Sequence, residues 1–184
     1  MKRCEACGEE IDKGEFNHPA CLKKLFGRPQ MPKIDLRLDE VQQVAQESAG
    51  NLSISGVQPK ISLALIRGQL TSVAHKGQYI LKPRQQTFRD IPENENLCMT
   101  MAAQWGIHVP PHTLIKLKDG SLAYIVRRFD RTRKGEKIHC EDFAQIFGLY
   151  CDDKYGRKSY ANIAEVLWVE AGERAVTEFI RRLV

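Results

Sequence analysis

The first 21 residues contain four side chains that could bind one metal ion. Cys4 and Cys7 are separated by two residues, and after ten more residues His18 and Cys21 repeat that spacing. Each pair has the spacing of a knuckle turn, so the four groups match a tetrahedral zinc site made of three thiolates and one imidazole. Four protein ligands leave no open position, and we therefore interpret the site as structural.

A redox-active C-x-x-C pair is the alternative interpretation of Cys4 and Cys7, but no strand of the thioredoxin type precedes them. No secretory signal is recognisable, and no apolar run approaches the roughly 20 residues that span a bilayer. The sequence thus predicts a cytoplasmic protein without membrane contact, in which cysteines stay reduced or bind metal. Because about thirty residues cannot bury a core, we expect the metal to supply the folding energy of this module.

A second candidate is the segment 52–60, which reads LSISGVQPK and runs into the apolar stretch Ile61–Ile66. Glycine lets the backbone approach a phosphate closely, backbone N–H groups can turn toward it, and Lys60 adds a positive charge. A small polar loop before a strand is commonly an ordinary turn, so this segment alone does not establish a phosphate site.

Three further polar groups follow along the chain. Lys82 closes an apolar strand, the acidic pair in Glu93-Asn94-Glu95 opens a helix, and charged residues follow a later strand from Arg127 to Arg131. Each has a plain interpretation as a solvated lysine, a helix cap favoured by the helix dipole, or an exposed loop. The order of glycine loop, strand lysine, helix glutamate and connecting segment is nevertheless that of a protein-kinase N-lobe, although G-x-G-x-x-G is absent.

The elements that must position these residues can be predicted from periodicity and turn residues. We expect strands at Ile61–Ile66, Tyr79–Lys82, Thr113–Lys116 and Leu122–Arg127, with a hairpin turn at Asp119-Gly120. We expect helices over residues 39–47 (capped by Asp39), 93–105, 141–149, 160–171 and 173–184. Strands, one helix, more strands and then helices indicate an α+β fold.

In the helix over residues 93–105, an apolar stripe at helical spacing is predicted to pack into the core; it consists of Cys98, Met101, Ala102 and Trp105. Pro29 and Pro32 favour a linker after the cysteine cluster. The resulting division is a zinc-binding module (1–30), a linker with a short helix (31–50), the main lobe (51–140) and a helical segment (141–184). A net charge of +5 favours anionic partners but does not by itself argue for nucleic acid.

From about residue 50 to residue 184 the chain resembles the N-terminal lobe of HipA-like serine/threonine kinases, the toxins of bacterial toxin–antitoxin pairs. The resemblance is carried by SISGVQPK (53–60), ILKP (80–83), ENE (93–95) and VRRFDR (126–131). The Ser-Ile-Ser sequence is most similar to the HipT-type branch, in which a separate small protein supplies the missing N-terminal subdomain. Here the zinc module stands in that position. The implied fold is a kinase-like N-lobe, an antiparallel sheet with one packed helix, followed by helices that lead to a C-lobe.

The resemblance also implies roles for individual residues. ATP with Mg²⁺ would be the cofactor. Lys82 would contact the ATP phosphates, Glu95 would pair with Lys82, the backbone of Arg127 to Phe129 would meet adenine, and Asp130 would lie near the ribose. The phosphate-binding loop would comprise Ser55, Gly56, Val57, Gln58 and Lys60. Ser53 and Ser55 match the autophosphorylated serines of the family, and a phosphoserine there would compete with the ATP phosphates.

The family's catalytic loop, N-x-D-x-H-x-K-N, and its later Mg²⁺-binding aspartate do not occur in the 184 residues. We therefore expect this chain to be an ATP-binding lobe that phosphorylates nothing alone. The resemblance implies a helix-turn-helix antitoxin or a small accessory subunit as partner, and an aminoacyl-tRNA synthetase as substrate. The alternatives are a regulatory or assembly subunit of a split kinase, which binds a partner protein without catalysis, and a zinc-dependent nucleic-acid binder. The basic stretch Arg127–Lys137 could contact RNA or another anionic partner, but a solvated hairpin is its plainer interpretation.

Overall fold

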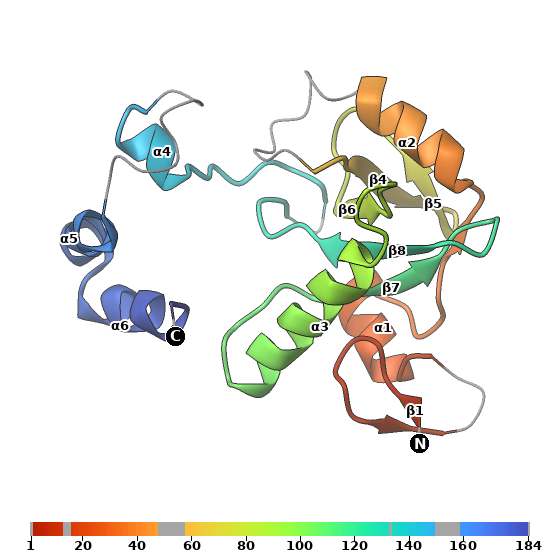
Figure 1. Ribbon diagram of the computed structural model, residues 1–184, viewed down its shortest axis with the longest axis horizontal. Helices are drawn as coiled ribbons and strands as arrows, with labels where there is room; N and C mark the ends of the chain where they lie inside the picture. The colour runs from red at the N-terminus through yellow and green to blue at the C-terminus, as the bar shows by residue number, and fades with distance from the viewer. Residues whose placement is uncertain (1, 13–15, 48–57, 133, 150–158, 184) are drawn as a thin grey trace. The chain divides into compact units, whose positions relative to one another are not determined.

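The computed structural model describes residues 2–12, 16–47, 58–132, 134–149 and 159–183 (Figure 1). Its contacts divide the chain into two units, Met1–Ile138 and His139–Val184, and each unit is described by itself. Ser55, Gly56 and Val57 of the predicted phosphate loop lie outside the described residues, as does Ser53, the other predicted phosphorylation site.

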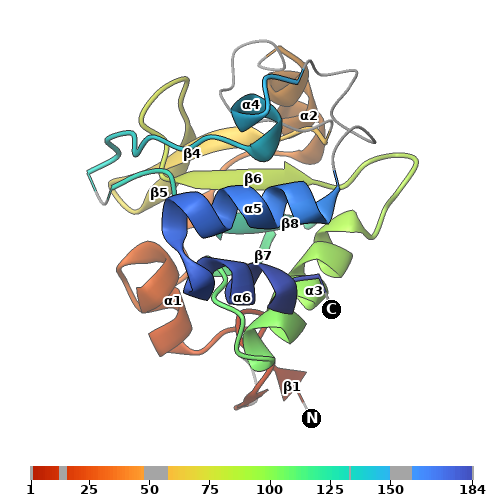
Figure 2. The same ribbon diagram turned by 90° about the vertical axis from the view of Figure 1, so that its left-hand side faces the viewer.

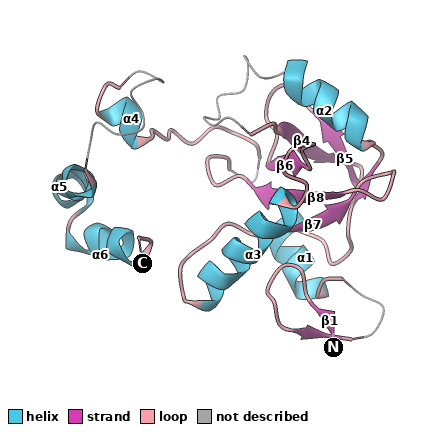
Figure 3. Cartoon of the chain, viewed as in Figure 1, coloured by secondary structure: helices cyan, strands magenta, loops and turns pink. Residues whose placement is uncertain are grey.

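A six-stranded sheet in the order β3-β5-β4-β6-β8-β7 forms the centre of the first unit. Neighbouring strands are antiparallel except for the short parallel pair β3–β5. The strands are β3 (Lys33–Ile34), β4 (Ile61–Ile66), β5 (Gln69–Ser72), β6 (Tyr79–Pro83), β7 (His112–Lys116) and β8 (Leu122–Arg127). Helices and strands are both abundant (Figure 3), and the predicted α+β class is confirmed.

The four predicted strands are present within one residue of their expected ends, and Asp119-Gly120 turns between β7 and β8. Strand β5 was not predicted. It follows β4 through Arg67 and Gly68, both of which have positive φ values of 50° and 83°. This is the geometry of a two-residue hairpin turn, but Arg-Gly is a weaker sequence signal than Asn-Gly or Asp-Gly.

Helices α1 (Pro19–Phe26) and α2 (Leu38–Glu47) attach to the sheet through apolar side chains. Helix α1 was not predicted; it begins with proline and ends at Gly27, which has φ 75° and donates to the carbonyl of Lys23. One core joins α1, α2 and the sheet; its members include Leu22, Leu25, Phe26, Val41, Ala45, Ile61, Leu63, Leu81 and Ile125. The helix that carries Cys21 is therefore part of the main core.

The start of α2 differs from the prediction that Asp39 caps it. Asp39 lies within the first turn. The backbone N–H of Arg37 instead donates to the carboxylate of Glu40 at 2.7 Å, and that of Leu38 donates to the carboxylate of Asp119 at 3.0 Å. The second bond comes from the β7–β8 turn, which no local sequence pattern reveals.

Helix α3 (Ile91–Gln104) buries a different face from the one predicted. Cys98, Met101 and Trp105 of the expected core stripe are exposed, and Ala102 is only partly buried. The buried residues of α3 are Pro92, Asn96 and Thr100. The prediction was wrong because hydrophobic periodicity cannot identify a packing face that consists mainly of hydrogen-bonding side chains.

Alternation along the central strands separates the core from the candidate site. Tyr79 and Leu81 of β6 contribute to the core with α1 and α2, whereas Lys82 points to the opposite face, where it meets α3. Tyr124 of β8 is paired with Lys82 across the ladder and lies on the same face as that lysine. Helix α3 thus covers the polar side of β6 and β8.

The second unit contains α4 (Phe143–Ile146), α5 (Tyr160–Ala171) and α6 (Glu173–Arg181). Helices α5 and α6 lie side by side (Figure 2), and the rings of Tyr160 and Phe179 are 6.3 Å apart. Capping boxes start α4 at Asp142 and α5 at Ser159. Among the described residues, no helix has the length and apolar character needed to cross a membrane.

The described core leads to a prediction about the loss of stability when a buried side chain of β4 is shortened. Leu63 of β4 is fully buried, so Leu63→Ala should lower the free energy of unfolding by about 2–5 kcal/mol. Leu97→Ala on the exposed side of α3 is the matched control and should change it by less than about 0.5 kcal/mol. Urea unfolding measures both values, and equal effects of the two substitutions would contradict the described core.

Candidate functional site

The metal-ligand candidates come together at the junction of a short β-ribbon and helix α1. Strands β1 (Lys2–Arg3) and β2 (Glu10–Ile11) pair antiparallel, and the loop between them carries Cys4 and Cys7. His18 directly precedes α1, and Cys21 lies in the first turn of that helix. The ligand atoms of the four residues all lie within 4.8 Å of one another.

Hydrogen bonds orient His18 for metal binding through Nδ1. Its Nε2 is 2.9 Å from the carbonyl oxygen of Glu10, and because that oxygen only accepts, the proton belongs on Nε2. Nδ1 then offers its lone pair beside Cys7 Sγ, 3.4 Å away. An imidazole fixed by a carbonyl in this way is the usual arrangement of a metal-bound histidine.

The thiols differ in how readily they lose a proton. Burial opposes ionisation of Cys4, but the backbone N–H groups of His18, Ala6 and Cys7 together hold its pKa below the ordinary value. Burial raises the pKa of Cys7, and burial together with the neighbouring Cys4 raises the pKa of Cys21 to about 12. A cation between the thiols would lower their pKa values, because zinc binds the deprotonated thiolates.

The geometry and chemistry of the four residues fit a metal ion. In a tetrahedral site with Zn–S bonds of about 2.3 Å, ligand atoms are separated by roughly 4 Å, close to the spread found here. Three thiols with one imidazole favour zinc over hard cations, which prefer oxygen. The Cys3His group could therefore bind a metal such as zinc.

A second cluster lies where β6 faces α3. Lys82 Nζ forms an ion pair with Glu95 Oε1, as expected, and both side chains are about one-quarter exposed (23% and 25%). Lys82 Nζ also lies 5.7 Å from the centre of the Tyr124 ring. Beside this pair, Arg84 forms a second ion pair with Glu93 in the first turn of α3. Strand β6 is thus joined to α3 by two ionic contacts.

Lys60 adds an extra positive charge to this cluster. Ile61 pairs with Leu81 in antiparallel register, so Lys60 and Lys82, the next residues outward, are opposite each other. Lys60 is 8% exposed. Burial lowers its pKa, Lys82 lowers it further, and Glu95 acts in the opposite direction. Lys60 thus lies within the electrostatic influence of both Lys82 and Glu95. Gln58, two residues before Lys60, has a buried amide nitrogen with no hydrogen-bond partner among the described residues.

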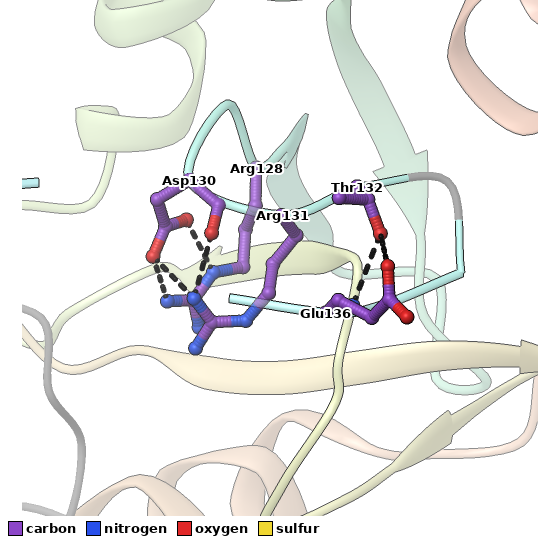
Figure 4. A network of polar contacts seen from close by, with 5 residues as sticks. All are labelled: Arg128, Asp130, Arg131, Thr132 and Glu136. Atoms are coloured by element: carbon purple, nitrogen blue, oxygen red, sulfur yellow. Dashed lines mark hydrogen bonds and ion pairs between the residues drawn. The ribbon is translucent and has the colours of Figure 1, made fainter. Parts of the chain in front are cut away.

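The connecting segment after β8 is held by a buried arginine (Figure 4). The Arg128 side chain is 3% exposed and donates to both oxygens of Asp130, at 2.8 and 2.5 Å, while Arg131 donates to the same carboxylate at 2.7 Å. The hydrogen bonds from Arg128 hold the pKa of Asp130 below its usual value, although partial burial opposes this. Phe129 between them is 73% exposed.

The structure therefore sorts the residues predicted from the sequence. It brings the four metal-ligand candidates together, and it brings Lys60, Lys82 and Glu95 together. The Asp130 carboxylate, expected near a ribose, contacts two arginines instead, and its nucleotide role stays a prediction. Sequence reasoning assigned no role to Tyr124 or to the side chain of Arg128. Their only signal was the alternation of the apolar strand, which has Tyr124 within it and Arg128 one residue beyond its end.

A cavity of about 810 Å³ lies elsewhere in the first unit. Its walls include Leu22 of α1, Met31, Ile34 of β3 and Leu114 of β7, and none of the predicted site residues lines it. The charged cluster at Lys82 is thus separate from this apolar cavity.

An antiparallel sheet with a strand lysine paired to a helix glutamate is the arrangement found in the nucleotide-binding lobe of protein kinases. The family model described as "HipA-like C-terminal domain" matches residues 52–184. The chain belongs to this HipA-like kinase family.

Two curated relatives indicate the same family. "Putative kinase Y4dM" of Sinorhizobium fredii is 39% identical over 156 residues, which cover 76% of this chain and 38% of the relative. "Putative kinase" of Haemophilus influenzae is 29% identical over 130 residues, covering 68% of this chain and 37% of the relative. The chain thus matches less than two-fifths of the length of either protein.

The thiol pKa values predict a strong pH dependence of metal binding. Because Cys7 and Cys21 are protonated near neutral pH and must ionise to bind, zinc affinity should rise by about tenfold per pH unit for each of them. Competition with a chromogenic chelator between about pH 6 and pH 8 measures this slope. Cys98→Ser, at an exposed thiol, should leave the slope unchanged. A flat profile in the parent protein would contradict thiolate ligation.

The buried arginine predicts a pH-dependent loss of stability in Asp130→Asn. This change leaves Arg128 without its counter-charge and should cost about 2–4 kcal/mol at neutral pH. The folded-state pKa of Asp130 is depressed, so its contribution is complete above about pH 4 and is lost as pH falls through the folded-state pKa. Urea unfolding should thus show the variant and the parent converging in acid.

The control is Asp35→Asn, at an exposed carboxylate that pairs with Lys118 on the surface. It should cost no more than about 1 kcal/mol at neutral pH. Equal costs for the two substitutions would show that burial of Arg128 has no energetic consequence.

Proposed function

We propose that the first unit is the ATP-binding lobe of a HipA-like serine/threonine kinase. The observation that carries the proposal is the meeting of Lys60, Lys82 and Glu95. Lys60 lies opposite Lys82 in the register of β4 and β6, and the Lys82–Glu95 ion pair lies beside it, so positively charged groups gather at this position. Phosphate anions are attracted to such a concentration of positive charge. Gln58, two residues before Lys60, has a buried amide nitrogen without a hydrogen-bond partner among the described residues, and in this proposal it donates to the same anion.

In this proposal, Lys82 contacts the phosphates of MgATP and Glu95 keeps its side chain in place. Lys60, Gln58 and the preceding loop, with Ser55, Gly56 and Val57, cover the phosphates. The backbone of Phe129 meets adenine in this proposal. The Phe129 backbone has no hydrogen-bond partner among the described residues, and its exposed phenyl ring would cover one side of the adenine. Bound ATP would supply the phosphoryl group. Kinases catalyse its transfer mainly by positioning the reactants and by stabilising negative charge. The acceptor hydroxyl belongs to the protein substrate, and the groups that direct it belong to the rest of the kinase.

Zinc is the proposed occupant of the Cys3His group, with a structural role because four protein ligands leave no position for a substrate. By the family resemblance we further propose a cytoplasmic location, an antitoxin or small subunit as partner, and an aminoacyl-tRNA synthetase as substrate. Phosphorylation of Ser53 or Ser55 would place a dianion where ATP phosphates bind and would switch binding off.

The test is a titration of the metal-loaded chain with MgATP, followed by the backbone NMR signals of Lys60, Lys82 and Glu95. We expect these signals to shift at millimolar MgATP. Lys82→Ala should weaken binding at least about tenfold, because it removes a charge-assisted hydrogen bond. Lys116→Ala is the matched control. Lys116 lies on β7 with its ammonium group 4.5 Å from the centre of the Phe16 ring, and its removal should have little effect on MgATP affinity.

No shift at these residues, or equal effects of the two lysine substitutions, would contradict nucleotide binding at this site. Such a result would favour the second candidate, an assembly subunit that binds a partner protein without nucleotide.

A further inference from the structure

Helix α3 contacts the metal-binding loop through one row of side chains. Asn96, Thr100 and Gln104 are spaced by four residues and therefore share a helix face. Asn96 Nδ2 donates to the backbone carbonyl of Glu5 at 2.7 Å, and Gln104 Nε2 donates to that of Cys7 at 3.5 Å. Asn96 is 5% exposed, so its bond to Glu5 is shielded from water. The row thus attaches α3 to the loop by directional contacts.

The two surfaces also approach each other closely at Gly8. A Cβ atom at this position would lie 2.8 Å from Gln104 Nε2 and 2.9 Å from Thr100 Cγ2. Both distances are shorter than a normal van der Waals contact, and the φ of 75° is also unfavourable for other residues. Glycine is required for the loop to lie this close to α3.

The accepting carbonyls belong to the segment that the metal would fix. Glu5 lies between the ligands Cys4 and Cys7, and Cys7 is itself a ligand. The loop is closed by backbone bonds from Gly8 to Cys4 and from Cys4 to Glu9, both 2.8 Å. Joining Cys4 and Cys7 to one ion would hold the carbonyls of Glu5 and Cys7 in their present directions.

The same helix carries the acid of the charged cluster. Glu95 is the neighbour of Asn96 and forms the ion pair with Lys82. Successive helix residues point about 100° apart, so α3 presents Asn96 to the loop while it presents Glu95 to β6. A shift of the loop would therefore displace the helix turn that carries Glu95.

We propose that the metal-loaded knuckle holds α3 so that Glu95 faces Lys82, with Asn96 as the positioning residue that transmits the restraint. The importance of Glu95 for nucleotide rests on the proposed function, whereas the coupling of metal to α3 does not. Metal occupancy then controls more than the folding of the N-terminal module, because it also sets the geometry of the charged cluster.

The first experiment compares amide hydrogen exchange in the full chain with and without zinc. Removal of zinc should accelerate exchange in α3 by roughly 5- to 150-fold, the usual range for coupled sites. Helix α2 is the internal control, because it attaches through Val41 and Ala45 and should keep its protection. Unchanged exchange in α3 after complete removal of zinc would overturn the proposal.

The second experiment uses metal-loaded Asn96→Ala, which keeps all four ligands. Exchange in α3 should accelerate about tenfold, and by reciprocity zinc should dissociate more easily, while the thiolate-to-metal absorption of the cobalt-substituted protein stays the same. Gln43→Ala is the matched control. It removes another side-chain amide bond, from Gln43 Nε2 to the Glu47 carboxylate at 2.9 Å, which lies within α2. It should change neither α3 exchange nor zinc affinity.

If zinc removal unfolds the whole first unit, the first experiment cannot separate coupling to α3 from global unfolding. The second experiment still can, because the Asn96→Ala variant keeps its metal. Local acceleration in α3 of metal-loaded Asn96→Ala, with α2 protected, supports the proposal. Acceleration everywhere, or none in α3, overturns it. Neither readout involves nucleotide, so an absence of MgATP binding would contradict the proposed function while leaving the coupling of metal to α3 standing.

Discussion

The ion pair between Lys82 and Glu95 is the contact on which the candidate site depends. Each side chain is about three-quarters buried, so removing either partner would leave a poorly solvated charge against the sheet. The pair stabilises the folded state only if α3 stays in register with β6, because charge–charge contact falls off with small displacements. The ion pair therefore acts mainly by favouring one position of α3 on β6.

The attachment of α3 differs in kind from that of the other helices in the first unit. Helices α1 and α2 bury Leu22, Leu25, Phe26, Val41 and Ala45. Helix α3 buries Pro92, Asn96 and Thr100, two of which are polar. Apolar burial is non-directional and tolerates sliding, whereas hydrogen bonds from Asn96 and an ion pair from Glu95 lose strength when direction changes. A helix held in this way is precisely oriented but depends on the integrity of its partners.

Much of the fold could be predicted from the sequence, and the failures have physical causes. Strands β4 and β8 and helix α5 have strong local patterns, and their ends agree with the predictions. Strand β5 is short and partly polar, and its Arg-Gly turn is a weak signal. The prediction of the buried face of α3 was wrong because Asn96 and Thr100 are buried where they bond to Glu5 and His112. Glu5 is 91 residues and His112 is 12 residues away, both outside the helix.

The candidate site shows the same division between local and distant information. Spacing alone predicted the Cys3His group, because each ligand pair is local. The Lys82–Glu95 pair was expected only through the order of parts in a kinase family. No pattern predicted that the knuckle would dock on α3, since that contact joins residues about ninety positions apart.

A helix with two polar anchors has a thermodynamic consequence. One anchor, the loop at Glu5 and Cys7, is ordered by the metal in our proposal, and the other, Lys82 with Glu95, responds to any anion that binds beside Lys60. When two ligands favour the same helix position, each must strengthen the binding of the other by the same factor. A helix with a large apolar face would suppress this linkage, because its position would already be fixed by burial. The polar face of α3 thus makes the placement of Glu95 depend on its two neighbours, and this dependence is what would allow a distant metal site to affect nucleotide binding.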